Sequence, residues 1–286
     1  SSWISTTNGN THKTKELALV HDCMPERSEP DVPLLKQRRR WLQGAEGYLA
    51  VSAATAQDIE GLLRLQAGSV PWCHPGHQEG FNIHTNLQRF SLLWKRTKSK
   101  LNIPEHFIIL PSSSCIGSYK NPELAARALL DPRLGHIGLI MSGVGSQQHC
   151  DQLAQSFPAL SNRCFAADFT DLELTLAYKH ALAVVIPSRI EGFGLPAIEA
   201  FASGANVVIA DSRGLRESGG EAALRCSPSN PKSLADILLM LSCENTLRWI
   251  KPVLHSRMRK RLSRLNNDLL GLSLLAIARQ LMNQND

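Results

Sequence analysis

The sequence predicts an α/β protein in which a doubly wound parallel sheet is combined with a second, incomplete domain of the same kind. From about residue 105 onward, short apolar runs alternate with helical patterns, which is typical of a parallel sheet with helices on both faces. The first 75 residues repeat this pattern in a shorter form. A chain of 286 residues is long enough for two cores of medium size.

The first part of the chain contains three candidate strands and two candidate helices. The helical patterns cover residues 34–43 and the stretch from the second strand to about residue 64. Because three strands make a thin sheet, we expect the upstream part of this domain to lie outside the 286 residues. The candidate strands are ELALVH at 16–21, YLAVS at 48–52 and SVPWC at 69–73.

The second part of the chain contains five further candidate strands with clear helix signals between them. Asn121-Pro122 and Asn230-Pro231 each place a capping residue before a proline at the first helical position. Gly204 follows a predicted helix at 196–203, where a glycine commonly ends a helix. The candidate strands are HFIIL at 106–110, IGLIM at 137–141, RCFA at 163–166, LAVVI at 182–186 and NVVIA at 206–210.

A stretch rich in Gly, His and Asn, HPGHQEGFNIHTN, separates the two parts and is typical of a linker. We predict that LLGLSLLAIA at 269–278 is a helix that packs on the body of the protein. The predicted boundaries are 1–82 for the incomplete domain, 83–104 for the linker, 105–245 for the complete domain and 246–286 for the C-terminal helices.

Composition excludes several classes of protein. Lys and Arg total 31 against 25 Asp and Glu, and the resulting net charge of +6 suits a phosphate-bearing or anionic partner. No aromatic-plus-basic stacking pattern occurs, so no nucleic-acid partner is expected. The seven cysteines form no C-x-x-C pair, so we expect no zinc site and interpret them as buried, reduced thiols. Since no run approaches the roughly 18 apolar residues of a membrane span and no signal peptide is apparent, we expect a cytoplasmic protein.

The segment RIEGFGLPAIEAFASG at 189–204 contains the strongest candidate for a binding site. The preceding strand ends at Pro187-Ser188, the chain turns through Gly192, Phe193 and Gly194, and Pro196 begins a helix. The glycines let the backbone come close to a ligand, and the N–H groups and dipole of the helix start favour an anion. A diphosphate would fit there.

Two glutamates flank this turn, Glu191 just before it and Glu199 one turn into the helix. Because a carboxylate repels a phosphate, we expect the two glutamates to bind hydroxyl groups. Glu199 would take a ribose diol, and Glu191 would take a sugar or the reacting centre. A pair of glutamates at a helix start is also commonly a solvated feature that the helix dipole favours.

Two loops after neighbouring strands are further candidates. Lys120 directly precedes the predicted cap at Asn121, so a mobile cation and a second helix start could neutralise a diphosphate leaving group without a metal. Gly143 lies in a Gly-Val-Gly turn that either approaches a ligand or serves the chain reversal alone. This turn has Gln148 where a dinucleotide fingerprint needs a small residue, and no G-x-x-x-x-G-K-[ST] occurs, which argues against dehydrogenases and P-loop enzymes.

These residues resemble the retaining glycosyltransferases of family 4, the glycosyl transferases group 1, which have the GT-B fold. The segment PSRIEGFGLPAIEAFASGANVVIA resembles the family's Glu-x7-Glu motif and the strand after it, and this is the most specific part of the resemblance. Weaker similarity covers SYKNPELAARAL, IGLIMSGVG, FTDLELTLAYKHALAVVIPS and EAALRCSPSNPKSLADILLML in the donor domain, and ALVHDCMPE and YLAVSAATAQDI at the end of a Rossmann-like acceptor domain.

The resemblance implies transfer of a sugar from a UDP-, GDP- or ADP-sugar to a hydroxyl of a saccharide or lipid-linked acceptor. Retention of anomeric configuration through front-face attack, with no metal, no other cofactor and no protein nucleophile, is implied as well. In the family, the residues that match Lys120 and Glu199 bind the diphosphate and the ribose. Those that match Glu191 and the amides of Gly192, Phe193, Gly194 and Leu195 bind the sugar and phosphate, and the match of His21 lies near the sugar.

Departures from the family pattern leave alternatives open. The loop PSSSCIGSYK has serines where many relatives carry an arginine before the lysine, so a non-catalytic nucleotide-sugar-binding or scaffolding module is the alternative function. His21 ends an apolar strand and is alternatively a packed or capping residue. The segment 248–265 carries seven basic residues and is interpreted either as a peripheral contact to anionic membrane lipid or as a solvated helix face.

Overall fold

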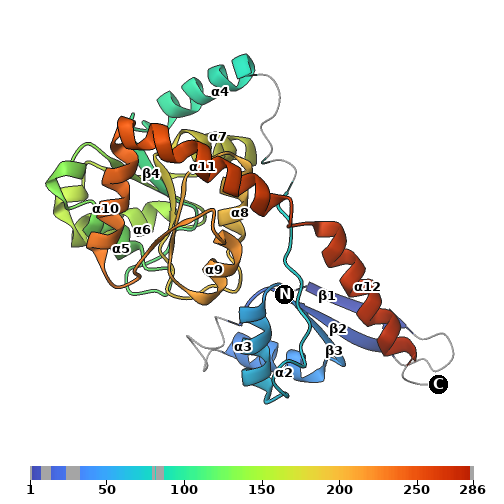
Figure 1. Ribbon diagram of the computed structural model, residues 1–286. Helices are drawn as coiled ribbons and strands as arrows, with labels where there is room; N and C mark the ends of the chain where they lie inside the picture. Colours follow the sequence, from blue (N-terminus) through green and yellow to red (C-terminus); the bar gives the residue numbers. More distant parts are fainter. Residues whose placement is uncertain (1, 8–13, 24–32, 79–80, 82–86, 284–286) are drawn as a thin grey trace. The chain divides into compact units, whose positions relative to one another are not determined.

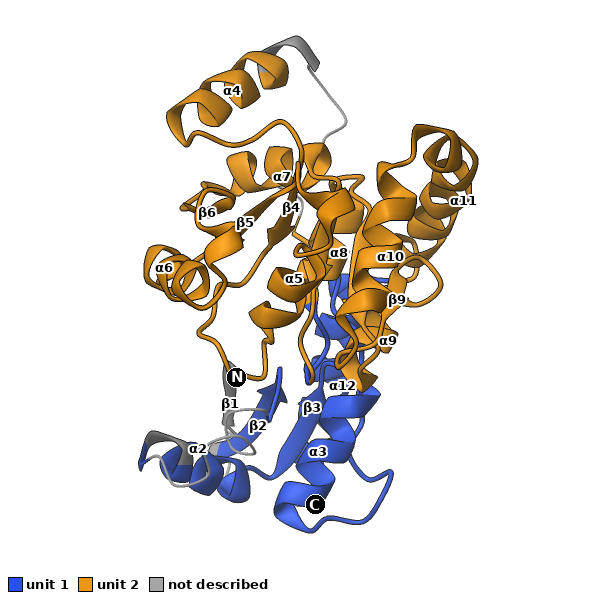
Figure 2. Ribbon diagram, turned by 90° about the vertical axis from the view of Figure 1, so that its left-hand side faces the viewer, with its two compact units in different colours: residues 1–76, 190–194, 265–286 blue, residues 77–189, 195–264 orange. Residues whose placement is uncertain are grey.

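The computed structural model describes residues 2–7, 14–23, 33–78, 81 and 87–283. The chain divides into two compact units, which Figure 2 shows in different colours. Residues 24–26 of the acceptor-domain resemblance and residues 83–86 of the predicted linker lie outside the described residues. Unit 1 contains Ser1–Gly76, Ile190–Gly194 and Leu265–Asp286, and unit 2 contains His77–Arg189 and Leu195–Arg264.

Unit 1 is built on a three-stranded sheet in the order β1-β2-β3. β1 (Ser2–Thr7) is antiparallel to β2 (Thr14–Val20), and β2 is parallel to β3 (Gly47–Ala50). Successive side chains of a strand point to opposite faces, so β2 packs on both sides. Helix α12 (Asn267–Asn283) lies beside the strands of this sheet (Figure 1) and packs against Leu17 on one face. Helices α2 (Pro33–Gly44) and α3 (Ala53–Leu63) pack against Ala18 and Val20 on the other face.

Two strand expectations for unit 1 fail. β1 was not predicted, because its sequence SWISTT reads as a polar N-terminus. The predicted strand at 69–73 is wrong: the segment makes a single bridge between Ala50 and Trp72. Pro71 has no N–H to donate, so its contact is limited to its carbonyl, which accepts from Ala50 N at 2.9 Å. The helix predicted at 269–278 is confirmed as α12 on the sheet.

Unit 2 is a six-stranded, all-parallel sheet in the order β6-β5-β4-β7-β8-β9. The five strands predicted for this part of the chain are confirmed. A sixth strand, β9, was not predicted, because its three residues alternate too briefly to be recognised. The strands are β4 (Phe107–Leu110), β5 (Gly138–Ser142), β6 (Cys164–Ala167), β7 (Ala183–Ile186), β8 (Val207–Ala210) and β9 (Leu224–Cys226).

Both faces of this sheet are covered, which is why its strands are continuous apolar runs. Ile108 and Leu110 face α5 (Pro122–Ala128), α6 (Ser146–Ser156) and α10 (Pro231–Ser242). Phe107 and Ile109 face the opposite layer. That layer contains α4 (Leu87–Lys100), α7 (Asp171–His180), α8 (Leu195–Ala202), α9 (Arg213–Gly219) and α11 (Glu244–Leu262).

The helix ends test the capping predictions. Asn230 caps α10 by accepting a hydrogen bond from Lys232 N at 3.1 Å, as predicted. Gly204 has a φ of 78° and ends α8, and Ala205 N donates to Ala200 O across this turn. Helix α11 continues through Pro252. The interpretation of all cysteines as buried is wrong for Cys115 and Cys243, which are exposed.

Candidate functional site

The strand order of unit 2 brings three of the predicted segments to one edge of its sheet. The chain runs from β4 outward through β5 and β6 and then returns to β7 on the other side of β4. Ligands of doubly wound sheets bind at the carboxyl ends of the strands where the order reverses in this way. The loop of Lys120 follows β4, the Gly143 turn follows β5, and the segment leading into the Glu191 motif follows β7.

Hydrogen bonds join the loops after β4 and β7. The side-chain nitrogen Nδ2 of Asn121 donates to Pro187 O at 3.0 Å and to Pro228 O at 2.9 Å. Asn121 is buried, with 1% of its surface exposed. Arg189 N donates to Tyr119 O at 2.8 Å. The loop that carries Lys120 and the strand end that leads into the motif therefore lie side by side.

Asn121 stands at the N-cap position of α5, as predicted, but without the side-chain hydrogen bond of a cap. The residue adopts a left-handed conformation with φ 58° and ψ 46°, and its side chain does not cap α5. The side-chain amide donates instead to the carbonyls of Pro187 and Pro228. Helix α5 nevertheless begins at Pro122, as the sequence indicated.

Two cations lie on these joined loops. Lys120 is half-buried, and its Nζ lies 5.3 Å from the centre of the Tyr119 ring. Arg189, which the sequence analysis did not select, has its Nη1 3.6 Å from Glu123 Oε1. Its only sequence signal was a position two residues before Glu191 in the motif. The β4 loop lacks the family's arginine, and Arg189 supplies a second cation to the same edge.

The Gly143 turn requires glycine for its backbone. Gly143 and Gly145 have φ values of 105° and 75°, in the region that side chains disfavour. Ser113 N donates to Ser142 O at 2.8 Å and Ser113 Oγ donates to Val144 O at 2.8 Å, so this turn adjoins the β4 loop. A binding role for Gly143 stays a prediction.

The glycine turn of the motif belongs to unit 1, together with His21. A Cβ on Gly192 would lie 2.1 Å from His21 O and 3.0 Å from Thr55 Oγ1, so glycine is required here for close approach. Gly194 has a φ of 97°, so glycine is required there for the conformation. The structure thus brings His21 and the predicted turn together.

Burial and charge perturb two of the predicted site residues. Burial lowers the pKa of His21, which favours the neutral form of its ring. Glu199 is half-buried on α8, and burial raises its pKa to about 7, with a smaller contribution from the Asp171 carboxylate. Burial and the neighbouring Glu199 charge raise the pKa of Tyr178. A carboxyl group that titrates near neutrality is a frequent feature of functional sites.

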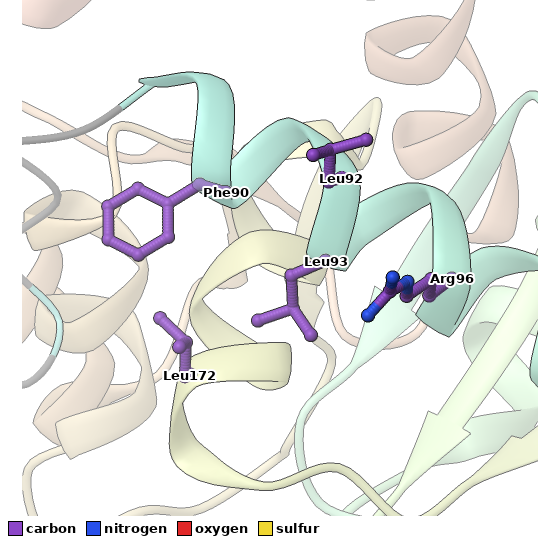
Figure 3. Close-up of a pocket in the computed structure, with 5 residues that line it drawn as sticks. All are labelled: Phe90, Leu92, Leu93, Arg96 and Leu172. Carbon is purple, nitrogen blue, oxygen red and sulfur yellow. The ribbon is translucent and has the colours of Figure 1, made fainter.

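A separate hollow lies between α4 and α7 and contains none of the predicted site residues. Its volume is about 490 Å³, and Phe90, Leu93 and Leu172 face one another in it (Figure 3). It is almost entirely apolar apart from Arg96, which does not suit a nucleotide with several phosphate and hydroxyl groups. The candidate site therefore depends on the loops at the strand ends.

Two features are absent from the part of the chain that the structure describes. None of its helices is both long enough and apolar enough to span a bilayer. Within the same residues, no three His, Cys, Asp or Glu side chains gather as a metal site would require.

Comparison with known families identifies the chain. A family model described as glycosyl transferases group 1 matches residues 95–251, which is more than half of the 286 residues. The chain belongs to this family. The match includes Lys120, Gly143 and the segment from Glu191 to Glu199, whereas His21 lies outside the matched range.

Individual relatives agree with this family. A D-inositol 3-phosphate glycosyltransferase of Streptomyces bingchenggensis is 28% identical over 251 residues, which are 81% of this chain and 52% of the relative. The O-antigen chain mannosyltransferase RfbU of Salmonella typhimurium is 43% identical over 61 residues, which are 21% of this chain and 17% of RfbU. The chain spans about half the length of the inositol relative.

Solved structures show the GT-B fold that the sequence predicted. Sucrose-phosphate synthase from Thermosynechococcus elongatus has a TM-score of 0.68 at 21% identity, covering 94% of this chain and 68% of the synthase. Anabaena HepE in complex with UDP-glucose has a TM-score of 0.70 at 17% identity, covering 92% of this chain and 72% of HepE. At these identities the likeness establishes the fold.

Proposed function

We propose that this chain transfers a sugar from a nucleotide-sugar to an acceptor hydroxyl, with retention of anomeric configuration and without a metal ion. The observation that carries the proposal is the position of the Glu191-to-Glu199 segment after β7, where the strand order reverses and where Asn121 and Arg189 join its start to the Lys120 loop. The structures of HepE with UDP-glucose and with UDP and glucose support a nucleotide-sugar as donor.

In the proposed mechanism the chain stabilises the charge of the leaving diphosphate. Lys120 and the amides of residues 192–195 bind the diphosphate as its bond to the sugar C1 breaks, and preorganised donors of this kind are each worth a few kcal/mol. The acceptor oxygen forms its bond to C1 on the same face, and its proton passes to the leaving phosphate oxygen. Glu191 and the neutral His21 bind the sugar hydroxyls, and Glu199 accepts hydrogen bonds from the ribose. The name of the O-antigen chain mannosyltransferase supports a saccharide acceptor.

A donor-consumption assay tests the activity. We expect the chain to release nucleoside diphosphate from at least one UDP-, GDP- or ADP-sugar, with an unchanged rate when EDTA is present. Glu191→Gln should lower turnover about 100-fold while the thermal unfolding midpoint is unchanged, because the substitution removes a charge at the reacting sugar. The anomeric configuration of the product, measured by NMR, tests retention.

The opposite outcomes are equally informative. Full turnover of Glu191→Gln would remove Glu191 from the mechanism. If the chain binds the donor but does not consume it with any acceptor tested, the non-catalytic nucleotide-sugar-binding module would be favoured. A rate that EDTA abolishes and Mg²⁺ restores would contradict metal independence.

We also propose that α11 contacts anionic lipid. Trp249 is 80% exposed and Val253 50% exposed on this helix, beside the exposed cations Arg257 and Lys260. An aromatic side chain between basic residues suits the surface of an anionic bilayer. A membrane that holds a lipid-linked acceptor would then lie next to the protein.

Vesicle sedimentation measures this contact. We expect binding to phosphatidylglycerol vesicles that weakens with salt, and little binding to phosphatidylcholine alone. Trp249→Ser combined with Lys260→Ser should lower the bound fraction at least threefold. Leu275→Ser is the matched control, because Leu275 is 55% exposed on α12 of unit 1. Equal binding of all variants, or equal binding to both vesicle types, would contradict the contact.

A further inference from the structure

Ser52 lies beside the glycine turn of the motif, although it is 140 residues distant in sequence. Its hydroxyl donates a hydrogen bond to the Gly192 carbonyl, and both residues belong to unit 1. We propose that Ser52 is a positioning residue that sets the direction of the Phe193 N–H toward the diphosphate of the donor. This inference rests on the proposed function, because that function assigns the diphosphate to the turn amides.

The surroundings of Ser52 hold its hydroxyl in one orientation. The residue is completely buried and is the N-cap of α3, where its Oγ accepts a hydrogen bond from Thr55 N at 2.9 Å. Thr55 Oγ1 lies 3.0 Å from Ser52 Oγ and donates its own proton to His21 O at 3.4 Å. The Gly192 carbonyl oxygen is the nearer of the two acceptors for the single Ser52 proton, the other being Thr55 Oγ1.

The geometry of the peptide bond links the Ser52–Gly192 hydrogen bond to the orientation of the Phe193 N–H. The carbonyl of Gly192 and the N–H of Phe193 belong to one planar trans peptide and point in opposite directions. Since Ser52 holds the carbonyl, the N–H of Phe193 must point away from Ser52. The N–H is one of the amides of 192–195 to which we assign the diphosphate.

Two further contacts prevent the turn from rotating about this hydrogen bond. The backbone of Gly192 lies against His21 O, with no room for a Cβ. The Phe193 ring is 3% exposed and stacks on His74 with centroids 4.8 Å apart and an interplanar angle of 19°. The ring centroids of His74 and Trp72 are in turn 4.9 Å apart. The turn is thus fixed before any ligand arrives, and such preorganised amides need no reorganisation when negative charge develops.

Substitutions at Ser52 separate the positioning role from the capping role. Glycine is nearly as good an N-cap as serine but has no hydroxyl for Gly192, whereas threonine keeps both functions. Calorimetry on the full chain first identifies which of UDP, GDP or ADP the wild type binds. The same titrations are then made with Ser52→Gly and Ser52→Thr, using that diphosphate and the matching nucleoside, which has no phosphate.

We expect Ser52→Gly to weaken binding of the nucleoside diphosphate about tenfold while binding of the nucleoside changes less than twofold. Ser52→Thr should restore the diphosphate affinity to within about threefold of the wild type. A merely structural role would lower both affinities together or neither. Thermal unfolding of each variant shows whether the fold is intact.

Three results would overturn the inference. Equal diphosphate affinity of the wild type and Ser52→Gly would mean that the hydroxyl does not orient the turn. If Ser52→Gly weakened binding of the nucleoside and of the diphosphate equally, Ser52 would have only a structural role. Absence of diphosphate binding by the wild type would overturn the proposed function itself and this inference with it, and is distinguished from the other two results because it appears before any substitution.

Discussion

Gly192→Ala is expected to lower the affinity for a nucleoside diphosphate at least 100-fold. The added Cβ would lie 2.1 Å from His21 O and 3.0 Å from the Asp22 Cβ, and the nearer neighbour is a backbone atom that cannot move aside easily. The turn must therefore shift and lose its contacts to Ser52 and His74. Overpacking of this kind typically costs about 1–3 kcal/mol of stability. Calorimetry measures the affinity, and urea denaturation measures the free energy of unfolding.

Gly61→Ala is the matched control for this substitution. Gly61 lies in α3 of the same unit, and nothing is within 4 Å of the Cβ that alanine would add. Alanine inside a helix is favoured over glycine by roughly 0.5–1 kcal/mol, so this variant should be slightly more stable and bind the diphosphate normally. If Gly192→Ala binds as tightly as Gly61→Ala, the turn does not hold the diphosphate.

Glu199→Gln is expected to make the protein more stable above pH 7 and weaker in donor binding. The pKa of Glu199 is raised from 4.5 to about 7, so the folded state binds this proton more tightly than the unfolded state. Stability from this group is therefore intact below about pH 4.5 and falls as the pH rises toward 7. Above pH 7 the cost of the buried charge is on the order of 3 kcal/mol, which glutamine removes.

Donor binding should follow the opposite course. A ribose diol donates its hydrogen bonds best to an ionised carboxylate, so the affinity of the wild type should increase as the pH rises through about 7. For Glu199→Gln the affinity should be about tenfold lower at pH 8 and independent of pH in this range. Urea denaturation at pH 5 and pH 8, with calorimetry at the same values, measures both effects.

Glu173→Gln is the control for the sign of this effect. The Glu173 carboxylate accepts a hydrogen bond from Thr170 N at 3.0 Å, which lowers its pKa. The same chemical change should therefore decrease stability above pH 5, where the carboxylate is ionised. A Glu199→Gln variant that is no more stable than the wild type at pH 8 would contradict the raised pKa.

Continuous apolar runs such as HFIIL and LAVVI predicted their strands well, because a strand buried on both faces needs an apolar side chain at every position. The same reasoning failed at 69–73, where the apolar pattern contains Pro71 and a ladder needs N–H donors. It also missed β9, a strand of three residues with Arg225 at its centre. Short segments carry too little pattern to separate a strand from a loop.

For the candidate site, too, the sequence predicted some residues and missed others. Its residue types and their spacing were readable, since a G-F-G-L-P turn between two glutamates has few structural reasons to occur. Ser52 had no sequence signal and Arg189 had only its place beside the motif, because a serine at a helix cap and an arginine beside a motif are common. Their importance arises from Tyr119 and Gly192, which are their neighbours only in the folded chain.

The sequence by itself determined the class of the sheet, the family resemblance and the presence of a glycine turn at 192–194, since these follow from side-chain pattern and local backbone preference. Tertiary structure alone decided that Gly192 needs glycine for close approach to His21, that Asn121 joins two loops, and that Glu199 titrates near neutrality. The physical reason is that close approach, hydrogen bonding and desolvation depend on atoms from chain segments that are far apart in sequence, and these meet only when the chain has folded.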